Sequence, residues 1–176
     1  GCAGYFAIKP VADRGVESVS LSVAVPAPEA PVPDRDGDGV FDTSSLYADK
    51  LAWPTAVACY EGGVFVGAPP DILYLKDADG DGRAEVREVV FSGFGLDNVQ
   101  GLLNSFNWGL DNVIRGATSG SGARVVSAAF PLEAPLTLRG RDFAIDARRR
   151  HLEATSGGAQ HGLSFDDWGH EFICHN

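Results

Sequence analysis

Two short acidic loops with nearly the same pattern constrain this chain more than any other feature. The first covers residues 34–42 and reads D-R-D-G-D-G-V-F-D; the second covers residues 77–85 and reads D-A-D-G-D-G-R-A-E. Alternating Asp residues on a glycine-containing turn bring carboxylates to one point, where they repel one another unless a hard cation binds between them. Calcium prefers such oxygen ligands, so both loops are predicted calcium sites.

The positions of the acids predict a set of calcium ligands. Both loops place carboxylates at the first, third, fifth and ninth positions, and the seventh position offers a backbone carbonyl. The second loop also fits the twelve-residue EF-hand pattern, with Gly82 at the sixth position and Glu88 at the twelfth, where the first loop has Ser45. The predicted ligands are Asp34, Asp36, Asp38, Val40 and Asp42 in the first loop, and Asp77, Asp79, Asp81, Arg83, Glu85 and Glu88 in the second.

The segments around the second loop favour strands over the helices of an EF-hand. Residues 72–75 before it and 86–91 after it are mainly β-branched and aromatic, and Pro69-Pro70 precede both. We therefore expect the loop to join two strands, where a bound ion would fix the turn. The alternative is that the Asp-Gly pairs only form tight polar turns without a metal.

Short apolar runs separated by turn residues predict β-hairpins. The chain contains 22 Gly and 10 Pro, and it has no long stretch of helical periodicity. Residues 55–68, 105–117 and 162–174 each contain an apolar run, a turn of Gly, Asn or Asp, and a second apolar run. These turn residues adopt the left-handed backbone that tight hairpins need, so we expect three hairpins.

The spacing of these hairpins and the paired acidic loops indicate a repeated unit. The hairpin turns lie near residues 62, 111 and 168, and propeller blades of four strands repeat at about 40–50 residues, with insertions tolerated. We predict an all-β fold in which residues 34–176 form a partial β-propeller of about two and a half four-stranded blades. The loop over residues 77–85 would then join the third and fourth strands of one blade.

The first part of the chain has a different character. Residues 24–33 form a run of Pro, Ala and Val, so residues 1–33 are predicted to be an extended N-terminal segment. Cys2 leaves open the lipidated cysteine of a bacterial lipoprotein whose signal peptide has been removed. We also expect the chain to be part of a longer protein, because residues 173–176 resemble the middle of a strand.

Charge and composition exclude several classes of function. The net charge is −10, much of it in the two loops, and no basic stripe is present to neutralise phosphates, so nucleic acid is excluded as a partner. No stretch is long and apolar enough to cross a membrane. The three cysteines include no C-x-x-C pair, and neither a phosphate-binding loop nor a G-x-S-x-G motif occurs.

Polar residues just before the predicted hairpins are candidates for a central channel. His161 precedes the third hairpin and is the candidate general base; the alternative is a histidine that only hydrogen-bonds neighbouring turns. Residues 98–101 hold the equivalent place before the second hairpin, and either line the channel or are solvated. Residues 139–143, which read R-G-R-D-F, either supply groups to the channel or, as we expect, contain an Arg–Asp ion pair at the surface.

Three segments in series carry a resemblance to a known family. They read P-P-D-I-L-Y-L-K-D-A-D-G-D-G over residues 69–82, G-L-D-N-V-Q-G-L-L-N-S-F-N-W-G-L-D-N over 95–112 and S-G-G-A-Q-H-G-L-S-F-D-D-W-G over 156–169. They closely resemble the N-terminal propeller of the bacterial membrane-bound dehydrogenase or haem-binding C-x-x-C-H proteins of planctomycetes. That propeller is similar to those of soluble pyrroloquinoline-quinone glucose and sorbosone dehydrogenases.

The resemblance implies a secreted or periplasmic propeller, membrane-associated in some forms, that oxidises a sugar or alcohol. It implies Ca²⁺, pyrroloquinoline quinone and an electron-accepting cytochrome domain, with haem c only in a domain downstream of this chain, and it carries over His161 as catalytic. The chain departs from the sugar dehydrogenases at Gly158-Ala159, which replace an Arg-Asn pair, and it contains no C-x-x-C-H motif.

Two functions therefore remain open from the sequence. The first is a calcium-stabilised segment of a quinoprotein-like dehydrogenase. The second is a non-catalytic calcium-binding propeller module that binds a carbohydrate or protein ligand. Fold likeness alone does not decide between them.

Overall fold

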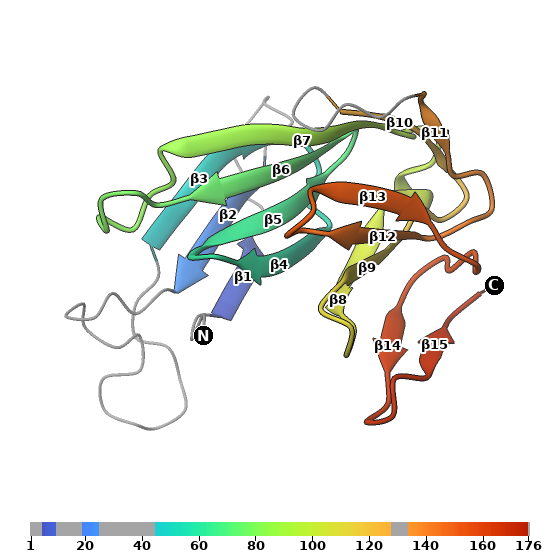
Figure 1. The fold of residues 1–176 in the computed structure, drawn as a ribbon. Helices are drawn as coiled ribbons and strands as arrows, with labels where there is room; N and C mark the ends of the chain where they lie inside the picture. The colour runs from blue at the N-terminus through green and yellow to red at the C-terminus, as the bar shows by residue number, and fades with distance from the viewer. Residues whose placement is uncertain (1–4, 10–18, 25–44, 128–133, 176) are drawn as a thin grey trace.

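Antiparallel strands form nearly all the regular structure of this chain (Figure 1). The computed structural model describes residues 5–9, 19–24, 45–127 and 134–175. Among these residues there is no α-helix, and the one helical element is the 3-10 turn η1 (Val99–Gly101). The prediction of an all-β chain is confirmed.

The strands belong to four antiparallel sheets. The first has the order β1-β2-β3, the second β11-β10-β7-β6-β5-β4, the third β13-β12-β9-β8, and the fourth is the pair β14-β15. The bounds are β1 (Tyr5–Lys9), β2 (Val19–Ala24), β3 (Ser45–Leu51), β4 (Ala56–Tyr60), β5 (Gly63–Ala68), β6 (Asp71–Lys76), β7 (Val86–Phe94), β8 (Asn104–Trp108), β9 (Ile114–Ala117), β10 (Ala123–Val126), β11 (Leu136–Thr137), β12 (Phe143–Asp146), β13 (His151–Ala154), β14 (Leu163–Phe165) and β15 (Glu171–Ile173).

The three predicted hairpins are confirmed as β4-β5, β8-β9 and β14-β15. At the first turn, Glu61 and Gly62 both adopt positive φ angles, 45° and 77°. Two consecutive left-handed residues match the twist of the flanking strands, which is why a two-residue hairpin forms here. Strands β4 to β7 then continue as a four-stranded meander, as the sequence predicted.

A further hairpin, β10-β11, was not predicted and is inserted within the four-stranded sheet of β8, β9, β12 and β13. It lies between β9 and β12 in the chain, yet β10 pairs with β7 at the edge of the preceding sheet. Gly93 permits this pairing, because a Cβ there would overlap the carbonyl oxygen of Arg124 and its φ of 104° is left-handed.

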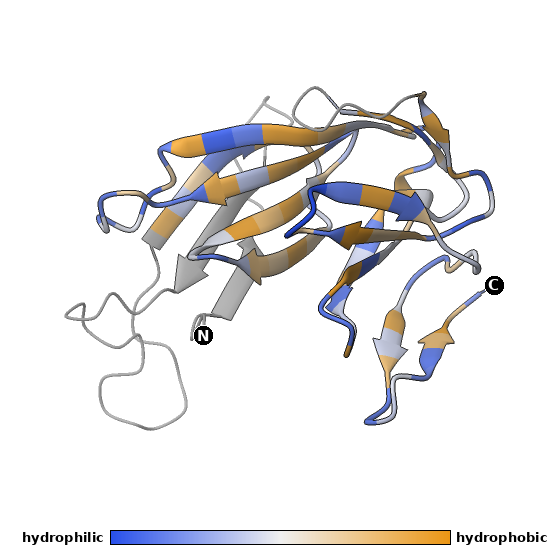
Figure 2. Ribbon diagram, in the orientation of Figure 1, coloured by the Kyte–Doolittle hydropathy of each residue, from blue (hydrophilic) through white to orange (hydrophobic). Residues whose placement is uncertain are grey.

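The second sheet is covered on both faces, and alternation along its strands assigns each residue to one face. On β5, Val64 and Val66 pack in a cluster with Tyr47 and Leu51 of β3. Phe65 between them packs in the other cluster, which continues into β8, β9, β12 and β13. Hydrophobic residues accordingly recur along the strands of both sheets, whereas the loops at the strand ends are mostly hydrophilic (Figure 2).

The first strands of successive units lie next to one another. Strand β4 contacts β8, and β8 contacts β14. Polar side chains join them: Thr55 donates a hydrogen bond to the carbonyl of Leu103 at 2.5 Å, and Asn104 donates to the carbonyl of Gln160 at 2.9 Å. Every sheet remains open among the described residues, so the propeller itself stays a prediction.

The N-terminal part, predicted as one extended segment, contains two strands among its described residues. Residues 5–9 and 19–24 form strands β1 and β2, and β2 pairs with β3. The Pro-rich run after Ala24 lies outside the described residues. None of the described segments forms a helix long and apolar enough to cross a membrane.

Candidate functional site

The loop between β6 and β7 gathers four carboxylates at one point. Each contributes one oxygen, and these oxygens all lie within 4.8 Å of one another. Opposite ligands of a Ca²⁺ ion are about 4.6–5.2 Å apart, since Ca–O distances are about 2.3–2.6 Å. The donor set could therefore hold a hard cation; its members are Asp77, Asp79, Asp81 and Glu85.

Backbone N–H groups of the loop hold these carboxylates in place. Asp77 accepts hydrogen bonds from Gly80 at 2.6 Å and Gly82 at 2.8 Å, one on each oxygen. Asp79, Asp81 and Glu85 each accept one such bond on a single oxygen, from Asp81, Arg83 and Ala78 respectively. Among the described residues, the second oxygen of these three carboxylates accepts no hydrogen bond from a backbone N–H.

Strand β3 supports the loop from the neighbouring sheet. The Tyr47 hydroxyl accepts a hydrogen bond from the N–H of Asp77 at 3.0 Å, and the Tyr47 carbonyl accepts one from Ala84 at 2.9 Å. Arg87 donates to the carbonyls of Asp49 and Lys50 at 2.8 and 2.9 Å. Both ends of the loop are thus fixed to β3, so a metal in the loop would stabilise the contact between two sheets.

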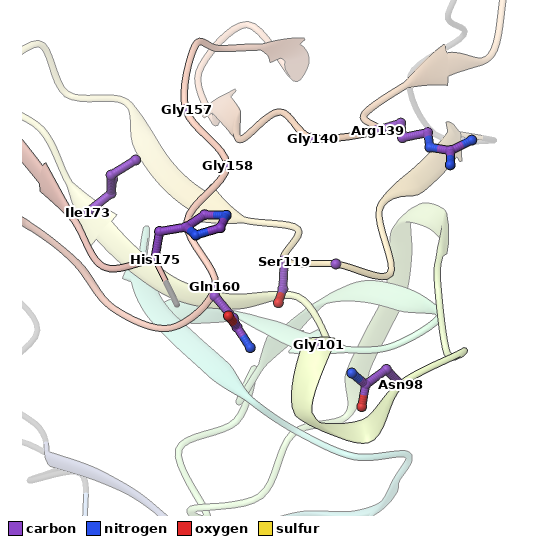
Figure 3. A pocket seen from close by; sticks show the side chains of 11 residues that line it. Asn98, Gly101, Ser119, Arg139, Gly140, Gly157, Gly158, Gln160, Ile173 and His175 are labelled. Carbon is purple, nitrogen blue, oxygen red and sulfur yellow. The ribbon is translucent and has the colours of Figure 1, made fainter.

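A cavity of about 700 Å³ lies where the first strands of the third and fourth sheets begin (Figure 3). Its walls are the turn before β8, the loop after β9, the residues before β12, the loop before β14 and the segment from β15 onward. The lining residues are Asn98, Gly101, Ser119, Gly120, Arg139, Gly140, Gly157, Gly158, Gln160, Ile173 and His175.

Hydrogen bonds between these loops shape the cavity. Asn98 caps η1 by accepting from the N–H of Gln100 at 3.0 Å. The turn carrying Ser119 is tied to η1, because Ser121 donates its N–H to the carbonyl of Gly101 at 3.3 Å. The loop before β14 is tied to the C-terminal segment, where Gln160 donates to the carbonyl of Cys174 at 2.9 Å.

A family model described as a domain of unknown function (DUF7133) matches residues 31–176. The chain belongs to this family. No curated protein and no solved structure gives a match. The DUF7133 domain includes both acidic loops and every residue that lines the cavity.

The structure brings together only part of the predicted metal ligands of the DUF7133 domain. Glu88 lies on β7 opposite Tyr74, outside the group of four carboxylates. Arg83 occupies the seventh position and donates its N–H to Asp81. The flanking elements are strands, as expected, and the twelfth-position acid Glu88 therefore does not join the cluster as it would in an EF-hand. The ligands predicted in the first loop lie outside the described residues: Asp34, Asp36, Asp38, Val40 and Asp42.

The predicted channel residues are distributed differently from the expectation. Asn98 and Gly101 line the cavity, as one alternative held. His161 is exposed and is not among the lining residues, whereas its neighbour Gln160 and the more distant His175 are. The sequence did not single out His175. Strand β15 runs antiparallel to β14, so the chain after β15 returns to the start of β14 and brings His175 to the cavity.

The predicted Arg–Asp surface pair within residues 139–143 is wrong, whereas Arg139 lines the cavity, as the alternative held. Asp142 is completely buried and accepts hydrogen bonds from the N–H of Ala159 at 3.2 and 3.1 Å. Arg141 instead donates to the carbonyls of Ala154 and Thr155. Adjacent residues on a chain point in different directions, and here the apolar neighbour Phe143 draws this segment into the core. Asp142 thereby positions the loop that forms one wall of the cavity.

We expect the stability of the domain to depend on pH through Asp142. Burial raises the pKa of the Asp142 carboxyl above its usual value, although N–H groups of Ala159, Thr118 and Gly158 offset part of this effect. A raised folded-state pKa favours the protonated form, so the stabilising contribution is complete below pH about 3.8 and is lost as pH rises through the folded pKa. Wild type should therefore lose stability relative to Asp142→Asn as pH rises from 4 to 7, measured by guanidinium unfolding. A constant difference over this range would contradict the assignment.

Proposed function

We propose that this chain is a calcium-stabilised propeller segment of a secreted or periplasmic protein and that its cavity binds a sugar or alcohol. Three features support the proposal: successive antiparallel four-stranded units, a preformed acidic loop, and a polar cavity. The cavity carries most weight, because a concave site with a few convergent polar side chains is the usual form of a small-molecule site.

The propeller part rests on how the units follow one another. The first strands β4, β8 and β14 are neighbours in space, and the sheets pack face to face through a shared apolar cluster. In a propeller, the innermost strands of successive blades adjoin in this way around a central axis. The two-stranded β14-β15 would be the start of a further blade.

The calcium part rests on the donor set of the loop over residues 77–85. Four carboxylates within reach of one ion, each held by a backbone N–H, match the oxygen coordination that Ca²⁺ prefers. The role is structural, because the loop lies at the far end of β6 and β7 from the cavity. An ion bound only by the folded loop would stabilise the fold by mass action.

The quinone of the sugar dehydrogenases does not fit the loop before β14. Gly158 offers no side chain to the cavity, and Ala159 is completely buried. The Arg-Asn pair found there in those enzymes thus has no replacement at these two positions. We therefore derive no chemical step through pyrroloquinoline quinone.

Two activities can be proposed for this chain, and the misfit of the quinone weighs against the first. The resemblance of the three sequence segments supports a quinoprotein-like dehydrogenase that passes electrons to a cytochrome domain. The exposure of His161 favours the second activity, a non-catalytic module that binds carbohydrate or protein. A base outside the cavity cannot take a proton from a ligand inside it.

The test is dye reduction by the full-length protein. It is supplied with Ca²⁺ and pyrroloquinoline quinone, and a panel of sugars and alcohols is offered with an artificial electron acceptor. Turnover that His161→Gln lowers at least tenfold would support the dehydrogenase. Sugar binding in calorimetry without turnover would support the binding module, and absence of both would overturn the proposed ligand class.

A further inference from the structure

The charge of the cavity lining is opposite to that of the chain. The chain carries a net charge of −10, yet among the described lining residues there is no Asp or Glu, while the cationic Arg139 is present. Arg139 is exposed at the rim and makes no ion pair within the described part of the chain. In Figure 3, His175 and Arg139 lie on opposite sides of the cavity, and the Arg139 guanidinium is directed away from His175.

The carboxylate of Asp142 lies next to this lining, but it does not offset the positive charge that a ligand in the cavity would meet. It lies behind the wall, completely buried, where the N–H of Ala159 holds it. It therefore shapes the wall and does not present an oxygen to a ligand. A negatively charged ligand would meet Arg139 and not this carboxylate.

Ser119 indicates that the ligand also offers hydrogen-bonding groups. The side chain is only 7% exposed, and its Oγ has no hydrogen-bond partner in the described structure. Buried hydroxyls are almost always partnered, and Ser119 also adopts a left-handed φ of 53° at the cavity wall. The side-chain oxygen of the exposed Asn98 caps η1, so among the described residues its amide nitrogen remains able to donate a hydrogen bond to a ligand.

Gly120 keeps room for such a ligand. A Cβ at this position would have no heavy atom within 4 Å, and the residue does not require a left-handed backbone. Neither packing nor conformation therefore demands glycine here. A larger side chain would enter open space beside Ser119 without disturbing the core.

We infer that the cavity is selective for an acidic sugar, whose carboxylate is bound by the exposed Arg139 side chain once it turns toward the cavity and whose hydroxyl groups meet Ser119, Asn98 and Gln160. The sugar part of this inference rests on the proposed function, and the charge selectivity goes beyond it. A cavity of about 700 Å³ has room for such a ligand. Arginine is suited to the carboxylate because its planar guanidinium binds both oxygens at once.

The experiment is calorimetric titration of the full chain with four probes: D-glucuronate, methyl glucoside, acetate and inorganic phosphate. We expect glucuronate to bind at least tenfold more tightly than each of the other three. Arg139→Gln should lower that affinity about tenfold, and Gly120→Leu should abolish binding while the melting temperature stays within about 2 °C. Arg124→Gln is the matched control, because Arg124 is an exposed arginine on β10 outside the lining.

The other outcomes separate this inference from the proposed function. Equal binding of glucuronate and methyl glucoside would overturn the charge selectivity and leave the proposed sugar site intact. Binding of phosphate or acetate as tight as that of glucuronate would show a bare anion site and overturn both. Binding that survives Gly120→Leu would place the ligand elsewhere and overturn the inference.

Discussion

Replacement of Phe143 by alanine is expected to lower the free energy of unfolding by about 3–5 kcal/mol. The ring is completely buried on β12 and lies between two sheets. Its centroid is 5.3 Å from that of Phe94 at the end of β7 and 6.2 Å from that of Phe106 on β8. Gly116 on β9 makes space for it, since a Cβ there would overlap the ring. The loss is therefore a cavity at the contact between two four-stranded units.

Guanidinium unfolding followed by tryptophan fluorescence measures this effect. Phe172→Ala is the control, because Phe172 on β15 is 57% exposed and should change stability by less than about 0.5 kcal/mol. Phe143→Leu should fall between the two, since it retains part of the buried volume. Equal losses for Phe143→Ala and Phe172→Ala would contradict the packing of these sheets.

Removal of Ca²⁺ is expected to have the second large effect. An ion present at about a hundred times its dissociation constant stabilises the folded state by about 2.7 kcal/mol for each site. Excess chelator should therefore lower the melting temperature by several degrees, because the freed carboxylates of residues 77–85 repel one another. Differential scanning calorimetry with and without chelator measures the shift.

Single substitutions can assign this effect to the second loop. Asp79→Ala should weaken Ca²⁺ binding and reduce the shift caused by chelator, because Asp79 contributes one of the four oxygens. Asp167→Ala, an exposed acid in the β14-β15 turn, should leave the shift unchanged. A calcium titration that Asp79→Ala does not alter would remove this loop from the proposed metal sites.

The local pattern of the chain predicted the strands and turns well. Runs such as residues 55–68 carry both the apolar periodicity and the turn residues of a hairpin, so the information lies within a few neighbouring residues. The second acidic loop is also local: its carboxylates and the N–H groups that hold them lie within nine consecutive residues. Sequence spacing alone was therefore enough to bring Asp77, Asp79, Asp81 and Glu85 together.

The sequence pattern did not predict the inserted hairpin β10-β11 or the strands β1 and β2. Strand β10 is recruited to the edge of β7, and its four residues show no pattern that names this partner. Residues 5–9 and 19–24 pair with each other and then with β3, which depends on contacts between distant parts of the chain. The sequence of an edge strand does not specify its partner, because every edge strand offers the same unpaired backbone N–H and C=O groups.

The all-β character, the hairpins and the acidic loop could be predicted from local sequence, because each depends on the backbone preferences of adjacent residues. The polar residues that share the cavity could not, since His175 and Ser119 line it and His161 does not. Asp142, which was expected at the surface, is buried in the structure. These outcomes depend on how separate loops meet at the ends of packed sheets. The packing is driven by burial of apolar surface such as that of Phe143, and the spacing of residues along the chain does not specify it.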